Sequence, residues 1–321
     1  MKIKSFAPGK VILFGEHSVV HNRPAIAMAI DKGVDVELNS RDDDIININI
    51  PVINYSEKLF LLNNVIDYNH IHNNMITDYV FEVISLFKFD KGFDLEVNIN
   101  MPLGVGLGSS AAVTVSCMKA ISLYANEDYD LETIAQKSRN IEITIQGAAS
   151  PIDTSMSTYG GIIYINRQSK LSRIDFDMQL PIIISDCNIE ANTGKLVESV
   201  RLKYVEYPEI MTNIFDAMGL IADNAKVALE EGNSQSLANL MNLNQGLLDS
   251  IGVNTFELSD MVFTARKFGA LGSKLTGSGG GGCIIAYAPN NTEEILQQLN
   301  LKYKAFKCEE SKKGVQAQII E

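Results

Sequence analysis

A glycine-rich turn at residues 102–112, PLGVGLGSSAA, restricts the fold more than any other segment of the chain. It follows a β-rich run and precedes an apolar segment with helical spacing, which predicts a strand–turn–helix unit. Gly104, Gly106 and Gly108 permit positive φ angles and a close approach of ligand to backbone. The free N–H groups at the start of the helix attract anions. We therefore predict a phosphate-binding loop.

This loop is not of the Walker A type, because GxxxxGK[ST] is absent. Its tandem serines, Ser109 and Ser110, offer an N-cap and a hydroxyl ligand for Mg²⁺. The alternative is a glycine-rich turn with a serine cap and no ligand. Three glycines, two serines and the small residues Ala111 and Ala112 exceed what a cap needs.

The overall charge limits the ways in which the chain can bind phosphate. Lys plus Arg total 27 and Asp plus Glu total 39, a net charge of −12, which argues against nonspecific binding of nucleic acid or anionic membranes. Phosphate must instead be bound locally by backbone amides, a helix end, a few lysines and a divalent cation. The four cysteines show no CxxC pairing, and no apolar run reaches the roughly 18 residues that span a bilayer. These features predict a cytoplasmic protein.

A second glycine-rich stretch, KLTGSGGGGC at residues 274–283, lies between two β-rich segments. Consecutive glycines are tolerated where a loop must pass close to a substrate or to another backbone. A flexible linker is the alternative, but linkers rarely have apolar β-rich flanks such as CIIAYA.

The amino-terminal segment APGKVILFGEHSVV brackets an apolar strand with charged residues. If the strand is regular, Lys10 and Glu16 share one face and could meet in a cleft, with His17 beside them. A solvated surface pair is the alternative.

The segment NIEITIQGAASPIDTSMS joins a helix to a proline. The helix carries Glu142 and ends at Gly147. We predict that Pro151 then fixes an extended loop that presents Asp153. An aspartate that only caps a turn is the alternative.

The pattern of the remaining residues predicts an α+β arrangement of two domains, residues 1–170 and 171–321. In the first, strands are predicted at 11–14, 25–30, 34–38, 45–50, 93–100 and 160–165, and helices at 74–87, 110–124 and 131–145. In the second, strands are predicted at 181–187 and 283–288, and helices at 195–203, 208–230, 234–248, 256–268 and 293–299. His70 and His72 are expected to lie in a polar loop without a metal.

Three segments in order, PGKVILFGEHSVVH, PLGVGLGSSAA and KLTGSGGGGC, resemble the signature motifs of the GHMP kinases over essentially the whole chain. The first motif and EITIQGAASPIDTSMSTYGG are similar to the mevalonate kinase family in particular, in an archaeal-like form. The resemblance implies the two-domain GHMP kinase fold. Its N-terminal domain is like ribosomal protein S5 domain 2, its C-terminal domain is a ferredoxin-like α/β sandwich, and the active site lies in the cleft between them.

The activity implied by the resemblance is ATP- and Mg²⁺-dependent phosphorylation of the 5-hydroxyl of (R)-mevalonate, in isoprenoid biosynthesis, by a homodimer. Another GHMP kinase, for phosphomevalonate, the mevalonate 3-position or a sugar, is the nearest alternative. A phosphorylated substrate would call for additional Arg or Lys at the acceptor site. A non-catalytic nucleotide or metabolite sensor is the alternative from another class, but it would be expected to lose Lys10 or Asp153, and both are present.

Residue by residue, the resemblance implies that Asp153 faces the acceptor hydroxyl beside Lys10, and that Ser110 and Glu142 hold Mg²⁺. His17 is the candidate for receiving the substrate carboxylate. The implied substrate contacts are Glu16, His17 and Thr193, and the implied ATP contacts are Pro102, Leu103, Gly104, Val105, Gly106, Leu107, Gly108, Ser109, Ser110, Ala111, Ala112, Gly277 and Gly279.

Two positions depart from the family pattern. Asn22 stands where many members have glycine, and Gly194 stands where a lysine often follows the threonine. Asparagine tolerates a left-handed backbone, so the first change is expected to be harmless. The second leaves the role of Thr193 open.

Overall fold

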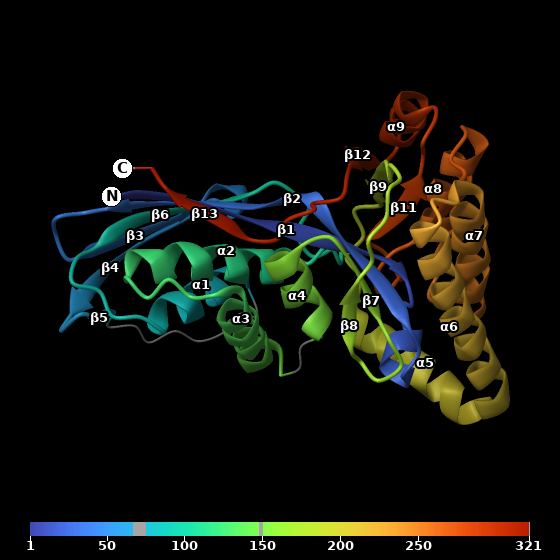
Figure 1. The fold of residues 1–321 in the computed structure, drawn as a ribbon, viewed down its shortest axis with the longest axis horizontal. Helices are drawn as coiled ribbons and strands as arrows, with labels where there is room; N and C mark the ends of the chain where they lie inside the picture. The colour runs from blue at the N-terminus through green and yellow to red at the C-terminus, as the bar shows by residue number, and fades with distance from the viewer. Residues whose placement is uncertain (67–74, 148–149, 321) are drawn as a thin grey trace.

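The protein folds around two β-sheets in separate halves of the molecule (Figure 1). The structure is a computed structural model that describes residues 1–66, 75–147 and 150–320. His70 and His72 lie outside the described residues, as does the beginning of the helix predicted from residue 74. None of the described helices has the length and apolar composition needed to cross a membrane.

The larger sheet has the strand order β13-β1-β2-β6-β3-β4-β5, and β7 and β8 extend it from β2. Helices α1 to α3 cover one face (Figure 1). The strands are β1 (Lys2–Phe14), β2 (Ala25–Ser40), β3 (Ile45–Ile50), β4 (Tyr55–Leu62), β5 (Val65–Ile66), β6 (Phe93–Ile99), β7 (Ile162–Ile165), β8 (Leu171–Arg173) and β13 (Gln316–Ile319). The helices are α1 (Ile76–Ser85), α2 (Ser109–Tyr124), α3 (Leu131–Gln146) and α4 (Pro151–Tyr159).

Alternating side chains explain which face of this sheet is covered. In β3, Ile46, Ile48 and Ile50 are buried while the residues between them are more exposed. Such a period of two places one apolar row against the helices. Helix α2 is buried along most of its length and packs on β1 and β2, so the predicted phosphate-binding loop that precedes it is joined to the centre of the core.

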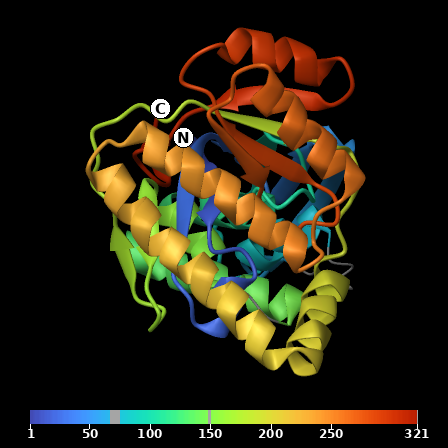
Figure 2. The same ribbon diagram turned by 90° about the vertical axis from the view of Figure 1, so that its right-hand side faces the viewer.

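The smaller sheet has the order β10-β11-β9-β12. Its strands are β9 (Ile182–Asp186), β10 (Gly272–Leu275), β11 (Cys283–Tyr287) and β12 (Lys304–Cys308). Its helices are α5 (Thr193–Glu206), α6 (Pro208–Glu230), α7 (Ser234–Ser250), α8 (Phe256–Lys267) and α9 (Thr292–Asn300). Figure 2 shows α6 and α7 side by side across this half. Every residue of β9 and β11 is buried, as expected for strands covered on both faces.

The prediction of separate strands at 25–30 and 34–38 is wrong, because both belong to β2. β1 pairs with β2 along almost its full length, with a register shift at which Pro8 faces Gly33 and Gly9 faces Ile30. The two residues between Ile30 and Gly33 form a bulge, which resembles a turn in the sequence.

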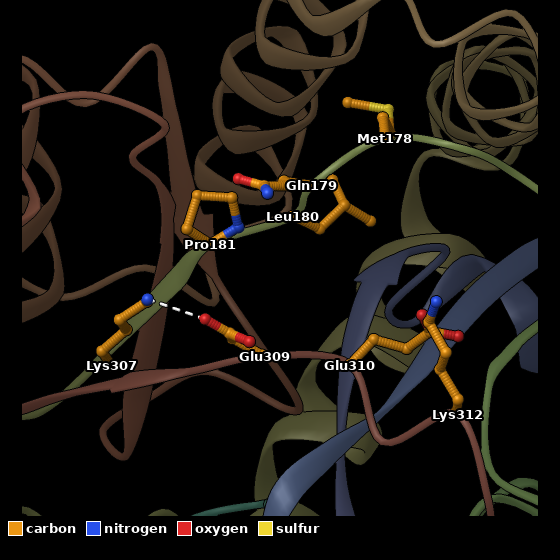
Figure 3. A pocket seen from close by; sticks show the side chains of 8 residues that line it. All are labelled: Met178, Gln179, Leu180, Pro181, Lys307, Glu309, Glu310 and Lys312. Atoms are coloured by element: carbon orange, nitrogen blue, oxygen red, sulfur yellow. Dashed lines mark ion pairs between the residues drawn. The ribbon is translucent and has the colours of Figure 1, made fainter.

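Two connections carry the chain between the sheets and lie beside each other. Segments 178–181 and 307–312 line a cavity of about 270 Å³, and the ion pair of Lys307 with Glu309 spans 2.7 Å (Figure 3). None of the residues lining this cavity belongs to the predicted site. β8 pairs with β7, and β13 pairs with β1, so parts of 171–321 join the larger sheet. The predicted boundary at residue 170 stays a prediction.

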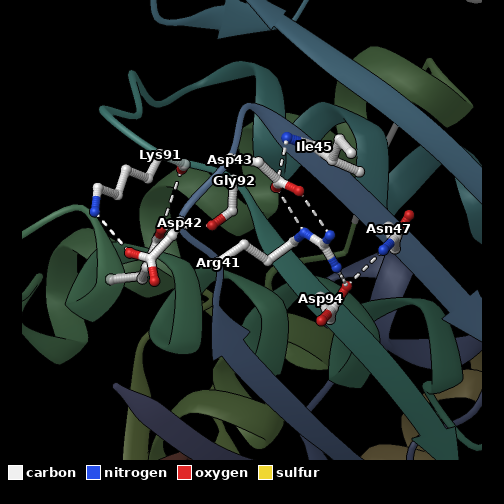
Figure 4. Close-up of polar contacts among 9 residues, drawn as sticks. Arg41, Asp42, Asp43, Ile45, Asn47, Lys91, Gly92 and Asp94 are labelled. Carbon is white, nitrogen blue, oxygen red and sulfur yellow. Dashed lines mark hydrogen bonds and ion pairs between the residues drawn. The ribbon is translucent and has the colours of Figure 1, made fainter.

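An exposed polar cluster fastens the loop between β2 and β3. Arg41 binds Asp43 at 2.7 Å and Asp94 at 2.9 Å, and Asn47 also donates to Asp94 (Figure 4). These carboxylates are nearly half exposed, so the cluster orders the loop and adds little stability.

Candidate active site

The predicted phosphate-binding loop connects β6 to α2 and has the backbone conformation that its glycines predicted. Gly104, Gly106 and Gly108 have φ angles of 72°, 83° and 72°. Gly108 is the N-cap of α2, with no side-chain cap bond, so the prediction of a serine N-cap is wrong. The cap residue is left-handed, which favours glycine over serine. The N–H groups of the first turn of α2 lack intrahelical acceptors and can bind an anion.

Lys10 joins β1 to this loop. Its Nζ donates to the Gly106 carbonyl at 2.9 Å, and its backbone N–H donates to the Leu107 carbonyl at 2.8 Å. The same Nζ lies 3.3 Å from Asp153 Oδ1. A Cβ atom added to Gly108 would lie 3.0 Å from Lys10 Cγ, so the lysine stem packs directly on the glycine. Lys10 is therefore held between the phosphate-binding loop and an acidic side chain.

Asp153 lies in the first turn of α4, so the prediction of an extended loop is wrong. Pro151 is the first helical residue, where its fixed φ angle fits and no N–H is needed. The Ser150 hydroxyl accepts the Ile152 N–H at 3.2 Å and caps the helix. The helix holds Asp153 opposite Lys10 more firmly than a loop would.

Ser110 and Glu142 approach each other from α2 and α3. The Ser110 hydroxyl donates to Glu142 Oε1 at 3.3 Å. Burial and the neighbouring charge of Asp153 raise the pKa of Glu142 to about 8. Both side chains offer hard oxygen donors, which Mg²⁺ prefers. Within the described residues no group of three or more His, Cys, Asp and Glu side chains gathers as a metal cage. One carboxylate and one hydroxyl suit a cation that also binds phosphate and water.

The prediction that Glu16 shares a face with Lys10 is wrong. β1 ends at Phe14 after a register shift, and Gly15 turns the chain with a φ angle of 98°. The Glu16 carboxylate instead forms an ion pair with Lys274 of β10 and accepts the Asn244 amide of α7 at 3.4 Å. The sequence analysis missed Lys274 and Asn244. Lys274 begins the second glycine-rich stretch, and that position was the available signal.

His17 and Thr193 meet at Ser278 in the second glycine-rich loop. Because a carbonyl can only accept, His17 Nε2 donates to the Ser278 carbonyl, at 2.8 Å. The Thr193 hydroxyl lies 3.0 Å from the Ser278 hydroxyl. Burial lowers the pKa of His17. The turn after β1, the start of α5 and the glycine-rich loop therefore converge.

The glycine-rich loop between β10 and β11 packs against other backbone segments, as predicted. A Cβ atom on Gly279 would lie 2.2 Å from the Val253 carbonyl oxygen, and one on Gly106 would lie 3.9 Å from the Gly277 Cα. The two glycine-rich loops therefore face each other across the junction of the two halves. Asn22 is left-handed, with a φ angle of 58°, a conformation that asparagine tolerates. That the change from glycine is harmless stays a prediction.

Comparison with known proteins places this geometry in a family. Residues 78–161 match the GHMP kinases N terminal domain, and residues 225–305 match GHMP kinases C terminal. The chain is 38% identical to the mevalonate kinase of Methanothermobacter thermautotrophicus, over 98% of this chain and 100% of the relative. It is also 38% identical to that of Pyrococcus furiosus, over 94% and 93%.

Solved structures agree with the sequence matches. The Methanococcus jannaschii mevalonate kinase superposes with a TM-score of 0.84 at 30% identity, over 97% of this chain and 98% of that chain. The L. major mevalonate kinase in complex with R-mevalonate superposes with a TM-score of 0.80 at 26% identity, over 96% and 95%. The two-domain GHMP kinase fold implied by the motifs is thereby confirmed, and the chain belongs to the mevalonate kinase family of the GHMP kinases.

Proposed function

We propose that this protein transfers the γ-phosphoryl group of ATP to the 5-hydroxyl of (R)-mevalonate and releases 5-phosphomevalonate and ADP. The observation that carries the proposal is the contact of Lys10 with both Asp153 and the phosphate-binding loop. A carboxylate, a cation and free helix-end amides are the groups that phosphoryl transfer to an alcohol needs. The similarity to mevalonate kinases over nearly the whole chain supports the choice of acceptor.

In the proposed mechanism, Asp153 accepts the proton of the acceptor hydroxyl, and the positive charge of Lys10 stabilises the negative charge on the transferred phosphoryl group. An alcohol is a poor acid, so its proton leaves as the bond to phosphorus forms. The amides of residues 104–109 bind the β- and γ-phosphates, and the contacts of Lys10 orient it toward both partners. Most of the rate enhancement then comes from positioning and charge.

Ser110 and Glu142 are the residues that would hold Mg²⁺. The fit rests on their oxygen chemistry, their 3.3 Å contact and the environment of Glu142, whose pKa is raised by burial and by the charge of Asp153. The metal would neutralise charge on the phosphates. Asp153 and Lys10 remain the groups that handle the proton and the acceptor.

Glu16, His17 and Thr193 border the acceptor site in this proposal, with different tasks. Glu16 is buried against Lys274 and Asn244, so it supports the side of the acceptor site without facing the substrate. The Thr193 hydroxyl is exposed enough to meet the substrate. A neutral imidazole has a single N–H, and that of His17 donates to the Ser278 carbonyl. Binding of the substrate carboxylate by His17 therefore stays a prediction. Contacts of Gly277 and Gly279 with ATP are likewise part of the proposal.

Purified protein with Mg²⁺ and ATP, offered mevalonate, phosphomevalonate, galactose and homoserine separately, tests the proposal. Formation of ADP only with mevalonate, and a phosphorus NMR signal coupled to the C5 protons of the product, is the expected result. A product at the 3-position or on a sugar identifies another GHMP kinase. Nucleotide binding without turnover on any acceptor identifies a sensor and overturns the proposal.

Two further features belong to the same proposal. A cytoplasmic location fits four free cysteines that are all buried. A homodimer is implied by the family resemblance alone, and light scattering of the purified protein across a concentration series measures it directly.

A further inference from the structure

His21 ends the short 3-10 turn η1 (Ser18–His21), which directly follows His17. Its imidazole ring stacks on two aromatic rings of the second half. The ring centroid lies 5.0 Å from that of Tyr204 on α5 and 4.3 Å from that of Phe215 on α6, with interplanar angles of 29° and 17°. Burial and the nearby charges of Arg23 and His17 lower the pKa of His21, so the ring is uncharged at neutral pH. It stacks as a flat aromatic group.

Arg23 strengthens this attachment. Its Nη1 donates to the His21 carbonyl at 2.5 Å, and its Nε donates to Asp216 Oδ1 on α6 at 3.0 Å. No hydrogen bond to the ring nitrogens of His21 is present among the described residues, so the ring is held in place by stacking. The end of η1 is therefore fixed to α5 and α6 through both its side chain and its backbone.

Apart from the stack of Tyr204 on Phe215 of α6, whose ring centroids lie 5.9 Å apart, helix α5 has few contacts that fix its position. All of α5 is described, and Val200 is its one buried side chain. Lys203 Nζ donates to the Ile251 carbonyl at 2.6 Å, and Leu196 packs beside Gly280. With Tyr204, these residues form a single stripe along the helix. The stack on His21 is the contact of this stripe that reaches the amino-terminal half.

The two ends of α5 are joined to the same turn. At its start, the Thr193 hydroxyl contacts the Ser278 hydroxyl, and the Ser278 carbonyl accepts a hydrogen bond from His17. At the other end, eleven residues or about 17 Å along the helix, Tyr204 stacks on His21. His17, turn η1 and α5 therefore form a closed ring of contacts, with Ser278 at one end and His21 at the other.

We propose that His21 is a positioning residue for acceptor binding: its ring, stacked on both Tyr204 and Phe215, sets the position of His17 relative to Thr193. The identity of the acceptor rests on the proposed function, whereas the ring of contacts does not. The phosphate-binding loop, Lys10 and Ser110 lie on other segments. Gly277 and Gly279 flank Ser278, but their loop is held separately by Val253, whose carbonyl accepts the Gly280 N–H at 2.8 Å and lies against Gly279. Loss of the stack therefore weakens acceptor binding and leaves ATP binding intact.

The test compares His21→Ala with His21→Phe, which keeps a flat uncharged ring. We expect His21→Ala to raise KM for mevalonate about ten-fold, with kcat and KM for ATP within about two-fold of wild type. His21→Phe should restore KM. Tyr129→Ala is the matched control, because it removes an aromatic contact with Phe87 at 5.4 Å in the other half. It should leave KM for mevalonate unchanged.

Amide hydrogen exchange gives a readout that does not require turnover. In His21→Ala, the amides of α5 should exchange about ten-fold faster than in wild type, while those of α2 stay unchanged. An unchanged KM and unchanged exchange overturn the inference, as does an equal loss in the Tyr129→Ala control. If wild-type protein does not phosphorylate mevalonate, the proposed function fails, and exchange in α5 alone then decides whether His21 positions the helix.

Discussion

Two lysine–carboxylate pairs join the segments of the site, and they differ in their access to solvent. The pair of Lys10 and Asp153 is open on its acidic side, since 33% of the Asp153 side chain is exposed. The pair of Lys274 and Glu16 is sealed, with side-chain exposures of 0% and 1%. Both pairs use a lysine on a β-strand, so the difference lies in what covers the acid.

The difference in exposure indicates a structural role for the pair of Lys274 and Glu16 and a chemical role for the pair of Lys10 and Asp153. A sealed pair satisfies its charges internally: Lys274 also donates to the Leu275 carbonyl, and Asn244 donates to Glu16. Burial lowers the pKa of Lys274, and the charge of Glu16 opposes that shift. Such a pair joins the two halves but has no group left for a substrate. The open pair keeps a carboxylate that an incoming hydroxyl can reach.

The largest effect is expected from Asp153→Asn, which keeps the size of the open acid and removes its basicity. We expect kcat to fall by about 10²–10⁴-fold, the usual contribution of a general base. The affinity for ATP and Mg²⁺ should change little, because the phosphate-binding loop is intact. Steady-state kinetics with calorimetric nucleotide binding measures both. Turnover near the wild-type rate would remove the distinction between the two pairs.

Breaking the sealed pair should act on stability. Lys274→Met leaves the Glu16 carboxylate buried without a cation, and we expect a loss of about 3–5 kcal/mol in the free energy of unfolding. The double variant Glu16→Gln with Lys274→Met should recover most of this loss, because neither charge remains. Urea denaturation provides the measurement.

Lys10→Met is the matched control for that experiment. Its partner Asp153 can be hydrated, so the loss of stability should be clearly smaller than for Lys274→Met. Equal losses for the two lysines would contradict the view that only one pair is sealed.

Local patterns in the sequence predicted much of the fold. Strand β3 and helix α6 have the predicted bounds, residues 45–50 and 208–230, because each is set by its own periodicity. Helix α4 was missed, because Pro151 can start a helix as readily as it can stiffen a loop. A short segment gives too few turns for periodicity to decide between the two.

The partners of the charged side chains were harder to predict. Asp153 and Lys10 were placed together through the family resemblance. The partner of Glu16 lies 258 residues away in the sequence, in a strand whose pattern gives no sign of a buried charge. A register shift of one residue near the end of β1 was enough to direct Glu16 away from Lys10. Contacts over such separations depend on the completed fold.

Glu142 lies beside the open pair of Lys10 and Asp153, and its pKa is raised to about 8. Its titration therefore tests the surroundings of that pair. The folded protein without nucleotide holds this proton, whereas the unfolded chain releases it near pH 4.5. The free energy of unfolding should therefore fall as pH rises from about 4.5 to 8, by at most about 1.4 kcal/mol per pH unit. Glu142→Gln should remove this slope.

Binding of magnesium and ATP should release the proton that Glu142 holds in the free protein. If Ser110 and Glu142 hold Mg²⁺, binding of magnesium and ATP requires the carboxylate form, and affinity should rise between pH 6 and about 8. Calorimetry in two buffers of different ionisation enthalpy counts the released proton. Proton release that persists in Glu142→Gln would assign it to another group.

The smallest effect is expected from Gly108→Ala, which tests how tightly the open pair is packed. Both Gly108 and Gly232 have left-handed φ angles, 72° and 66°, but a Cβ atom meets Lys10 Cγ at 3.0 Å in the first case and nothing within 4 Å in the second. Backbone strain should cost about 1 kcal/mol in each variant. Only Gly108→Ala should also lower kcat, by a few-fold, because a shift of Lys10 disturbs its contacts with Gly106 and Asp153. Urea denaturation and kinetics of the two variants together separate strain from displacement, and equal kcat values would show that the lysine stem adjusts without moving its charge.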